Sequence, residues 1–360
     1  VGSEMCIRDS IRGLPDPLPL GTRWRPLEET APLGLGATPA KIDRSWGRAS
    51  YSAWIATADD PLLYEQGRDR DPGAEEASLP PPQTWPDTGP LGLFPRGAVA
   101  GDCLHRILEQ FPFTAGEAED PAAVTPADLI QAELRRAGLD PELTASVEDG
   151  LQRVLQTPLG GLLGALKLAD IGSDQRLHEL SFDLPVQRVR TCDLVAAFRC
   201  DPTARFGLGY ADQLEGLAVN SRGFLTGSIA RVFCDPCSGR WWVLDWKSNW
   251  IGERRSEPSE VRCGPVHYHQ AAMEEQMVHH HYPLQAHLYL VALHRHLAAR
   301  LPGYSAEHHL GGYVYCFLRG MPGAERYDPD HGDAGPGRRV GAAPLLRVDA
   351  LDRARGGMSA

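Results

Sequence analysis

The 360-residue sequence lacks several features that would assign it to common classes of protein. It has no run of 18 or more apolar residues, so we predict no membrane-spanning helix. It has no GxxxxGK[ST] pattern, which excludes a nucleotide-binding P-loop from this chain. Basic residues are in deficit, since 36 Lys and Arg stand against 47 Asp and Glu, giving a net charge of −11. That balance argues against a free-standing nucleic-acid binder, but it allows a local basic channel or delivery of DNA by a partner protein.

Eight cysteines without an evident secretion signal indicate a reducing cytoplasm rather than a disulfide framework. Cys234 and Cys237 form a CxxC pair, but a zinc knuckle needs a second pair of ligands. Cys192, Cys200 and Cys263 do not repeat the spacing. We therefore interpret the CxxC pair as part of a turn.

Histidines could also suggest a metal site, because five of them lie on or near one predicted helix: His267, His269, His279, His280 and His281. Adjacent residues on a helix face apart, which works against a shared ion. We favour a solvated helix end.

Composition divides the chain into four parts. Residues 1–10 (VGSEMCIRDS) are interpreted as a non-native artefact that resembles sequencing-adapter read-through, and we expect the chain to begin inside a longer reading frame. Residues 11–90 are predicted to be a Pro-rich linker with one short packed segment near 45–55. A folded domain is predicted over 91–322, and the final residues, 323–360, are predicted to form a loose tail.

Apolar periodicity predicts both helices and strands. Leu104, Ile107, Leu108 and Phe111 recur at i, i+3, i+4 and i+7, which is typical of an amphipathic helix. Further helices are predicted over 126–137, 141–157, 266–280 and 283–300. Strands are predicted over 176–186 and 311–321, and a hairpin over 223–233 and 240–248. This order predicts an α/β fold with a mixed central sheet flanked by helices.

The second strand of the hairpin ends in Asp245-Trp246-Lys247. Side chains alternate along a strand, so Asp245 and Lys247 share one face and Trp246 points into a core. A carboxylate that holds Mg²⁺ and a lysine that orients water or stabilises developing charge suit phosphodiester hydrolysis. Alone, the tripeptide is weak, and an exposed salt-bridging strand end explains it better.

Longer motifs give the hairpin a context. VLDWKSNWIG is followed by HYHQAAMEEQMVHHHYPLQAHLYLVALHRHL and HLGGYVYCFLRGM, and it is preceded by SYSAWI and FPRGAVAGDCLHRILEQFPF. Together these motifs, spread over roughly 45–322, resemble the C-terminal nuclease domain of RecB, the beta subunit of RecBCD (exodeoxyribonuclease V). That domain belongs to the PD-(D/E)xK superfamily. The resemblance implies a restriction-endonuclease-like fold, Mg²⁺, a DNA substrate, RecC-like and RecD-like partner subunits, and helicase domains upstream in the same polypeptide.

Carried over residue by residue, the resemblance implies two metal ligands, His105 and Asp245. It implies catalytic roles for Lys247 and for Glu179 as a supporting residue, and it places the family's Gln and Tyr on Gln285 and Tyr289. Those two are four apart on one helix face, where they would contact DNA or support the site. From the residues alone, each has an ordinary alternative: a packed histidine, a solvated strand carboxylate, or helix packing.

One position departs from the family. The first strand of the hairpin should read Gly-x-Ile-Asp-x-Val-Phe, but Ala230 stands where the metal-binding Asp is expected. Ser228 offers only a neutral oxygen, and Asp235 lies in the turn, too far along to replace the carboxylate. The expected function is therefore that of a DNA nuclease domain in double-strand break repair, impaired by Ala230. The alternative is an inactive nuclease fold that serves as a structural or DNA-handling part of the complex. A third interpretation is an AddB-like or stand-alone nuclease.

Overall fold

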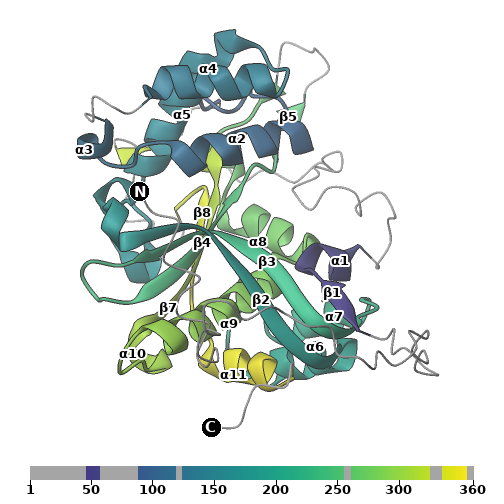
Figure 1. Ribbon diagram of the computed structural model, residues 1–360. Helices are drawn as coiled ribbons and strands as arrows, with labels where there is room; N and C mark the ends of the chain where they lie inside the picture. Colours follow the sequence, from purple (N-terminus) through teal and green to yellow (C-terminus); the bar gives the residue numbers. More distant parts are fainter. Residues whose placement is uncertain (1–45, 57–87, 119–123, 255–260, 325–334, 355–360) are drawn as a thin grey trace, which may run out of the picture. The chain divides into compact units, whose positions relative to one another are not determined.

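The computed structural model describes residues 46–56, 88–118, 124–254, 261–324 and 335–354 (Figure 1). They all lie in one compact unit of the chain, residues 44–360. The predicted artefact at 1–10 and most of the predicted linker at 11–90 lie outside the described residues. None of the described helices is both long enough and apolar enough to cross a bilayer.

Six strands form the central sheet, in the order β1-β3-β4-β7-β8, with β2 also paired to β3. β3 runs antiparallel to β2 and β4, whereas β4 and β7 are parallel. The sheet is therefore mixed, as predicted. Its strands are β1 (Gly47–Ala49), β2 (Arg176–Arg190), β3 (Asn220–Cys234), β4 (Trp241–Lys247), β7 (Leu310–Phe317) and β8 (Arg338–Ala342).

Helices cover both faces of this sheet (Figure 1). One face carries α2 (Ala98–Gln110), α4 (Pro126–Arg136) and α5 (Thr144–Gln156). The other face carries five helices: α6 (Thr191–Arg199), α7 (Leu208–Leu214), α8 (Gln270–His279), α9 (Tyr282–Arg300) and α11 (Leu345–Ala354). The remaining α-helices and strands of the described residues are short: α1 (Tyr51–Ile55), α3 (Ala115–Ala118), α10 (Ala306–His309) and the strand pair β5 (Glu253–Arg254) and β6 (Val261–Arg262).

This arrangement confirms the predicted α/β fold class and is consistent with a restriction-endonuclease-like fold. It produces two apolar cores, one on each side of the sheet. β4 divides its side chains between them: Trp242, Leu244 and Trp246 enter the α2 side, and Val243 enters the α9 side. Alternation along a strand places Asp245 on the face of Val243.

The amphipathic helix predicted around residue 104 is confirmed. All four of its periodic apolar side chains are fully or almost fully buried, and the helix spans Ala98–Gln110. Thr125 caps α4 through its side chain, which accepts a hydrogen bond from the backbone N–H of Asp128, and Pro126 begins the helix.

The predicted loose tail is wrong for its described part, residues 335–354. β8 pairs with β7, and α11 buries Val348 and Leu351 in the core on the α9 side. Arg347 of α11 is fully buried and donates hydrogen bonds to the backbone oxygens of Asp201, Ala204 and Arg205. The Gly- and Pro-rich composition just before β8 suggested a loop, but β8 and α11 follow it and are stabilised by contacts with the rest of the domain.

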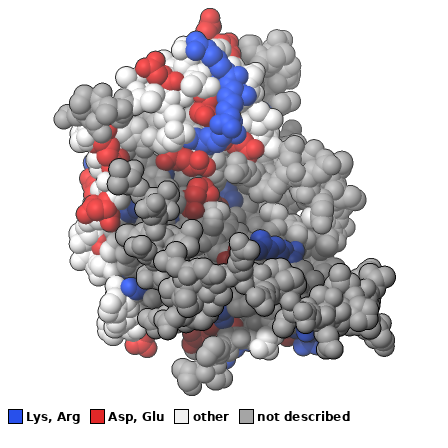
Figure 2. All heavy atoms as spheres, in the orientation of Figure 1, with Lys and Arg blue, Asp and Glu red and all other residues white. Residues whose placement is uncertain are grey.

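Charged side chains are mixed on the face drawn in Figure 2, where Lys and Arg gather over α2 and α4 with acidic side chains beside them. Arg135 and Arg136 close the last turn of α4. Arg106 of α2 pairs with Glu133 of α4 at 2.6 Å. Basic charge on this face is thus local and partly neutralised, in keeping with the overall acidic balance.

Candidate active site

The candidate site lies where two strands separate. β4 pairs with β3 only from Arg231↔Leu244 to Cys234↔Trp241. One edge of β3 pairs with β2 along almost its whole length. The opposite edge pairs with β4 at one end and with β1, at residues 223–225, near the other end. Residues between these two pairings, including Thr226, Gly227 and Ala230, line a pocket of about 320 Å³.

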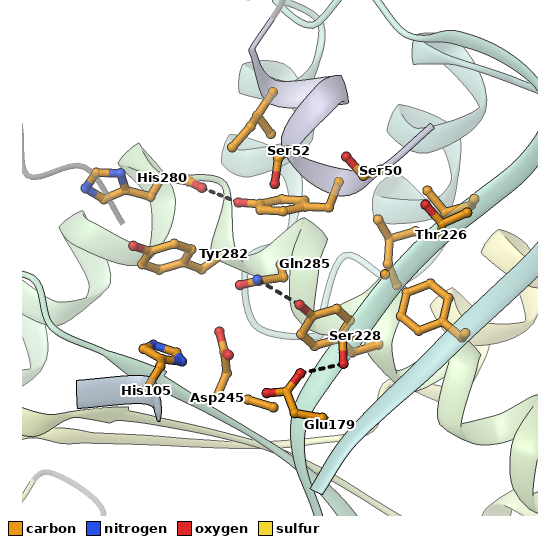
Figure 3. A pocket seen from close by; sticks show the side chains of 18 of the residues that line it. Ser50, Ser52, His105, Glu179, Thr226, Ser228, Asp245, His280, Tyr282 and Gln285 are labelled. Carbon is orange, nitrogen blue, oxygen red and sulfur yellow. Dashed lines mark hydrogen bonds between the residues drawn. The ribbon is translucent and has the colours of Figure 1, made fainter. Parts of the chain in front are cut away.

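The pocket gathers every site residue that the sequence predicted (Figure 3). They come from α2, β2, β4 and α9, four elements that are distant in sequence. Figure 3 shows His105 and Asp245 beside each other and Glu179 turned toward Ser228. The predicted residues in the lining are His105, Glu179, Asp245, Lys247, Gln285 and Tyr289.

Asp245 and Lys247 form a buried ion pair at the base of the pocket. The Lys247 Nζ lies 2.9 Å from Asp245 Oδ2, and the two residues are 6% and 4% exposed. Trp246 between them is 2% exposed and packs on the opposite side of the sheet. The predicted division of faces around the tripeptide is therefore confirmed.

Lys247 is held from three directions. Besides Asp245, its Nζ donates to Gln285 Oε1 at 3.2 Å and sits 3.6 Å from the centre of the Tyr282 ring. A cation over an aromatic face is stabilised by the ring quadrupole. Gln285 is itself fixed, because its Oε1 accepts from Tyr315 Oη at 2.9 Å and its Nε2 donates to Tyr289 Oη at 3.1 Å. α9 thus fixes the lysine's position and supports the site.

His105 reaches the pocket because α2 is clamped against the sheet. Arg231 of β3 donates to the backbone oxygen of Leu108 at 2.6 Å, and His178 of β2 hydrogen bonds to that of Glu109 at 3.0 Å. Burial, with the nearby charges of Arg231 and Arg176, lowers the pKa of His178 to about 4. The neutral ring can then accept a hydrogen bond from Arg231.

Arg319 fixes the other end of the same helix. Its guanidinium is buried and donates to the backbone oxygens of Leu91 and Phe94, before α2, at 2.7 Å each. It also donates to Ser248, just after β4, at 3.0 Å. The start of α2 and the end of the Asp-Trp-Lys segment are therefore tied to one side chain.

Ala230 lies between the two carboxylates of the pocket. β2 pairs His178 with Arg231 and Leu180 with Ile229, so Glu179 falls opposite Ala230 in this register. On the other side, the pair Arg231↔Leu244 ends the ladder, and one more step would set Ala230 opposite Asp245. In strand register, position 230 thus stands between Glu179 and Asp245.

Glu179 has an unusual backbone. Its φ is +45°, which is uncommon for a residue with a side chain, and the ladder omits its pair with Ala230. Its carboxylate accepts a hydrogen bond from Ser228 Oγ at 2.7 Å. The residues before and after Glu179 still pair with β3, so the irregular backbone is confined to the glutamate.

We tested whether these residues fit a metal ion. Among the described residues, no three His, Cys, Asp or Glu side chains converge on one point. Asp245 Oδ2 is buried and accepts no hydrogen bond of good geometry, and its near neighbour is the Lys247 ammonium. One buried carboxylate with an adjacent histidine fits Mg²⁺, which is commonly bound by one or two carboxylates plus water and phosphate. It does not fit a closed structural zinc site.

Sequence reasoning missed part of this pocket. Tyr282 was not singled out, although it shares a helix face with Gln285 and Tyr289 at i, i+3 and i+7. Tyr51 of α1 also lines the pocket, and its hydroxyl donates to the backbone oxygen of His280 at 2.5 Å. SYSAWI was noted only as a motif, without a role for its side chains.

The predicted solvated histidine end is wrong for three of its members, of which His267 is only 5% exposed. His280 lines the pocket and stacks on Tyr282 with 5.2 Å between ring centres. His281, at φ +55°, begins α9 and contacts Tyr210 Oη at 3.2 Å. Burial lowers the pKa of His281 to about 4. His279 is exposed as expected.

Comparison with known proteins gives the site a family context. No family profile matches the chain. It is 32% identical over 343 residues to RecBCD enzyme subunit RecB of Mycolicibacterium smegmatis, which covers 88% of this chain and 29% of that protein. The chain is related to RecB. It is also 34% identical over 311 residues to RecB of Mycobacterium tuberculosis, covering 79% of this chain and 26% of the relative.

A more distant relative agrees. RecB of Escherichia coli is 33% identical over 238 residues, which is 63% of this chain and 17% of that protein. The RecB resemblance predicted from the motifs is confirmed by these matches. The chain spans less than a third of the length of the RecB proteins that it matches.

Proposed function

We propose that this chain carries a PD-(D/E)xK-type nuclease domain that cleaves DNA with Mg²⁺. The observation that supports this most strongly is the pocket at the β3–β4 fork. Six side chains chosen from the family resemblance, on four separate elements, line one cavity. Packing alone would not require residues of this chemistry to meet there.

The chain's own groups suit a phosphodiester. His105 and Asp245 would hold Mg²⁺, which when bound would activate water and polarise a phosphoryl oxygen. Lys247 presents a fixed positive charge that can hold a phosphate oxygen or orient the attacking water, and it can stabilise charge that develops in the transition state. Gln285 and Tyr282 keep that ammonium in place, so little reorganisation is needed when the substrate binds.

Ala230 makes this a weakened nuclease in our proposal. Loss of a partner that merely supports a metal site costs roughly 10–100-fold in affinity or activity, and loss of an anionic ligand should cost at least as much. The pocket otherwise keeps its lysine, its histidine and one buried carboxylate. We therefore expect slow cleavage rather than none.

Relatedness to RecB supports further parts of the proposal. A RecBCD enzyme subunit implies RecC-like and RecD-like partners, and we propose that this chain works with such subunits in the cytoplasm during DNA repair and recombination. Delivery of DNA by partner subunits would also reconcile a DNA substrate with a net charge of −11.

The test is degradation of linear DNA by the 360-residue chain with Mg²⁺ or with a chelator. We expect slow, Mg²⁺-dependent cleavage that Asp245→Asn reduces at least about 100-fold, since this change removes the one buried ligand carboxylate. The variant should keep the circular dichroism spectrum of the native chain. Equal rates for the two proteins would contradict the proposal.

A second candidate is a DNA-handling domain without cleavage, which is favoured by Ala230 and by the lack of three converging metal ligands among the described residues. It predicts that the chain binds DNA in a gel-shift assay but releases no fragments with Mg²⁺. It further predicts that Asp245→Asn leaves DNA binding unchanged.

A further inference from the structure

We propose that the exposed aromatic pair Trp46 and Phe224 is a stacking site for single-stranded DNA, outside the pocket and on the path to it. The inference rests on the proposed function, because it takes DNA as the ligand. It adds a second binding surface, which holds the bases of an unpaired strand while another part of the strand lies in the pocket.

Two large aromatic side chains lie together on the surface near the start of β3. Trp46, just before β1, is 57% exposed, and Phe224 of β3 is 36% exposed. Their rings meet edge to face, with 6.0 Å between the ring centres. Every other described Trp, Phe and Tyr is buried or half-buried. Single exposed apolar residues are common on protein surfaces, but two adjacent rings beside a candidate active site point to a ligand.

The pair stands on the face of β3 that leads to the pocket. Leu225 and Ile229 enter the core on the α9 side. Alternation therefore turns Phe224, Thr226 and Ser228 to the opposite face. Thr226 and Ser228 line the pocket (Figure 3). At about 3.3 Å per residue, Phe224 lies about 13 Å from Ser228 along this one strand, so a DNA strand stacked on Phe224 reaches the pocket along β3.

Arginine side chains accompany the rings. Arg48 pairs with Phe224 in the parallel ladder between β1 and β3, which places both side chains on one face. Arg222 is exposed and lines a surface groove together with Trp46 and Phe224. Aromatic rings that stack on bases and basic groups that hold the phosphates are the combination that single-strand binding surfaces use. The groove thus supplies local basic charge in a chain whose net charge is −11.

The ion pair of Arg48 leaves its guanidinium accessible to a phosphate. Arg48 lies 3.8 Å from the Asp183 carboxylate, and the two side chains are 70% and 53% exposed. Such an exposed pair contributes little to stability. A phosphate can accept two parallel hydrogen bonds from a guanidinium, so it can replace the carboxylate. Asp183 is therefore a weak competitor for the phosphate.

The rings favour a single strand over a duplex. In a duplex the faces of the bases are covered by their neighbours in the stack, whereas an unpaired base offers its face to an aromatic side chain. A partner protein also binds exposed aromatic residues. The arginines, and the continuity of this face with the pocket, favour DNA.

The experiment measures the fluorescence anisotropy of an end-labelled oligothymidylate of about 12 nucleotides, titrated with the full chain in a chelator that prevents cleavage. Phe224→Leu should weaken binding at least about 5-fold, since it keeps an apolar side chain but removes the ring. Phe224→Tyr keeps a ring and should bind within about twofold of the native chain. Leu346→Ala is the matched control: Leu346 is 61% exposed on α11, which packs on the α9 side of the sheet, and its loss should leave binding unchanged.

The charged residues give a test with opposite signs. Arg48→Gln should weaken binding and should lower the slope of log affinity against log salt by about 0.7, which is the value for one phosphate contact on a single strand. Asp183→Asn should strengthen binding, because it removes the competing carboxylate. A duplex of the same length should bind Phe224→Leu as well as it binds the native chain.

Three results would overturn the stacking site. They are an unchanged single-strand affinity in both Phe224→Leu and Trp46→Leu, an equal loss for single strand and duplex, and no binding of the oligonucleotide by the native chain. The first result would assign the rings to a protein contact. Degradation of linear DNA by the native chain tests the nuclease separately, so cleavage without an effect of the ring variants removes only the stacking site. A chain that neither binds the oligonucleotide nor degrades DNA contradicts both proposals.

Discussion

The two ends of the β3–β4 hairpin carry buried aspartates in opposite situations. At the turn, Asp235 is 7% exposed and its oxygens accept hydrogen bonds from the backbone N–H of Cys237 at 3.0 Å and of Ser238 at 3.3 Å. At the open end, Asp245 is 6% exposed and faces one ammonium group across the pocket floor. A buried carboxylate that the backbone satisfies stabilises the fold, whereas one that faces an ammonium group and keeps a buried oxygen without a hydrogen bond is available for chemistry.

Strand pairing explains the difference. At the turn the two strands stay in register and the chain reverses tightly, so nearby N–H groups converge on Asp235. At the open end the strands part after Leu244, and no backbone ladder from β3 remains beside Asp245. An aspartate at one end of the hairpin thus stabilises the turn, and an aspartate at the other end lines the pocket.

The largest effect should come from completing the open end. Ala230→Asp restores a carboxylate opposite Asp245, and we expect Mg²⁺-dependent DNA degradation to rise about 10–100-fold. Ala230→Asn is the matched control, because it adds similar bulk without the charge. The measurement is release of acid-soluble fragments from linear DNA, and a similar gain in both variants would show that charge is not the cause.

The sequence predicted this end of the molecule well, since the Asp-Trp-Lys spacing fixed the faces of β4 and the motif flanks selected residues that meet in one pocket. It could not predict the left-handed backbone of Glu179, because a strand pattern of side chains carries no signal for one irregular φ. Tyr282 was missed for a different reason: an aromatic residue at the start of an apolar helix suits packing as well as a cation contact.

The fold was also predicted unevenly. Elements with strong periodicity, such as α2, were recognised from the spacing of their apolar side chains. α11 was not, because its stability comes from contacts with other parts of the chain, including the buried Arg347 on three backbone oxygens. Such long-range contacts leave no local pattern.

A smaller effect is expected when the closed end is broken. Asp235→Ala removes the acceptor for two backbone N–H groups and should lower the free energy of unfolding by about 1–3 kcal/mol, since the donors lose their partner. Urea denaturation followed by circular dichroism measures this. The affinity for Mg²⁺ should stay at the native value in folded protein. A loss of Mg²⁺ affinity without a loss of stability would contradict a purely structural role for Asp235.

Acid should weaken the helix that supports the open end. His287 of α9 is 1% exposed, and its Nδ1 donates to the backbone oxygen of Pro283 at 2.6 Å. Burial lowers the pKa of His287 to about 3. The unfolded chain takes up this proton near pH 6.5 and the folded chain does not, so stability should fall from about pH 6.5 toward pH 3.

The size of that loss follows from linkage. A pH of 5 lies about 1.5 units below the ordinary pKa of histidine. Protonation of this side chain in the unfolded chain therefore lowers the free energy of unfolding by about 2 kcal/mol at most. His287→Leu removes the proton site, so its stability should fall less than that of the native chain between pH 7 and pH 5. Urea midpoints at the two pH values give the comparison. Equal losses of stability in the two proteins would mean that other groups cause the acid sensitivity. A smaller loss in the variant would assign the acid sensitivity to His287, in the helix that fixes Gln285 and Lys247.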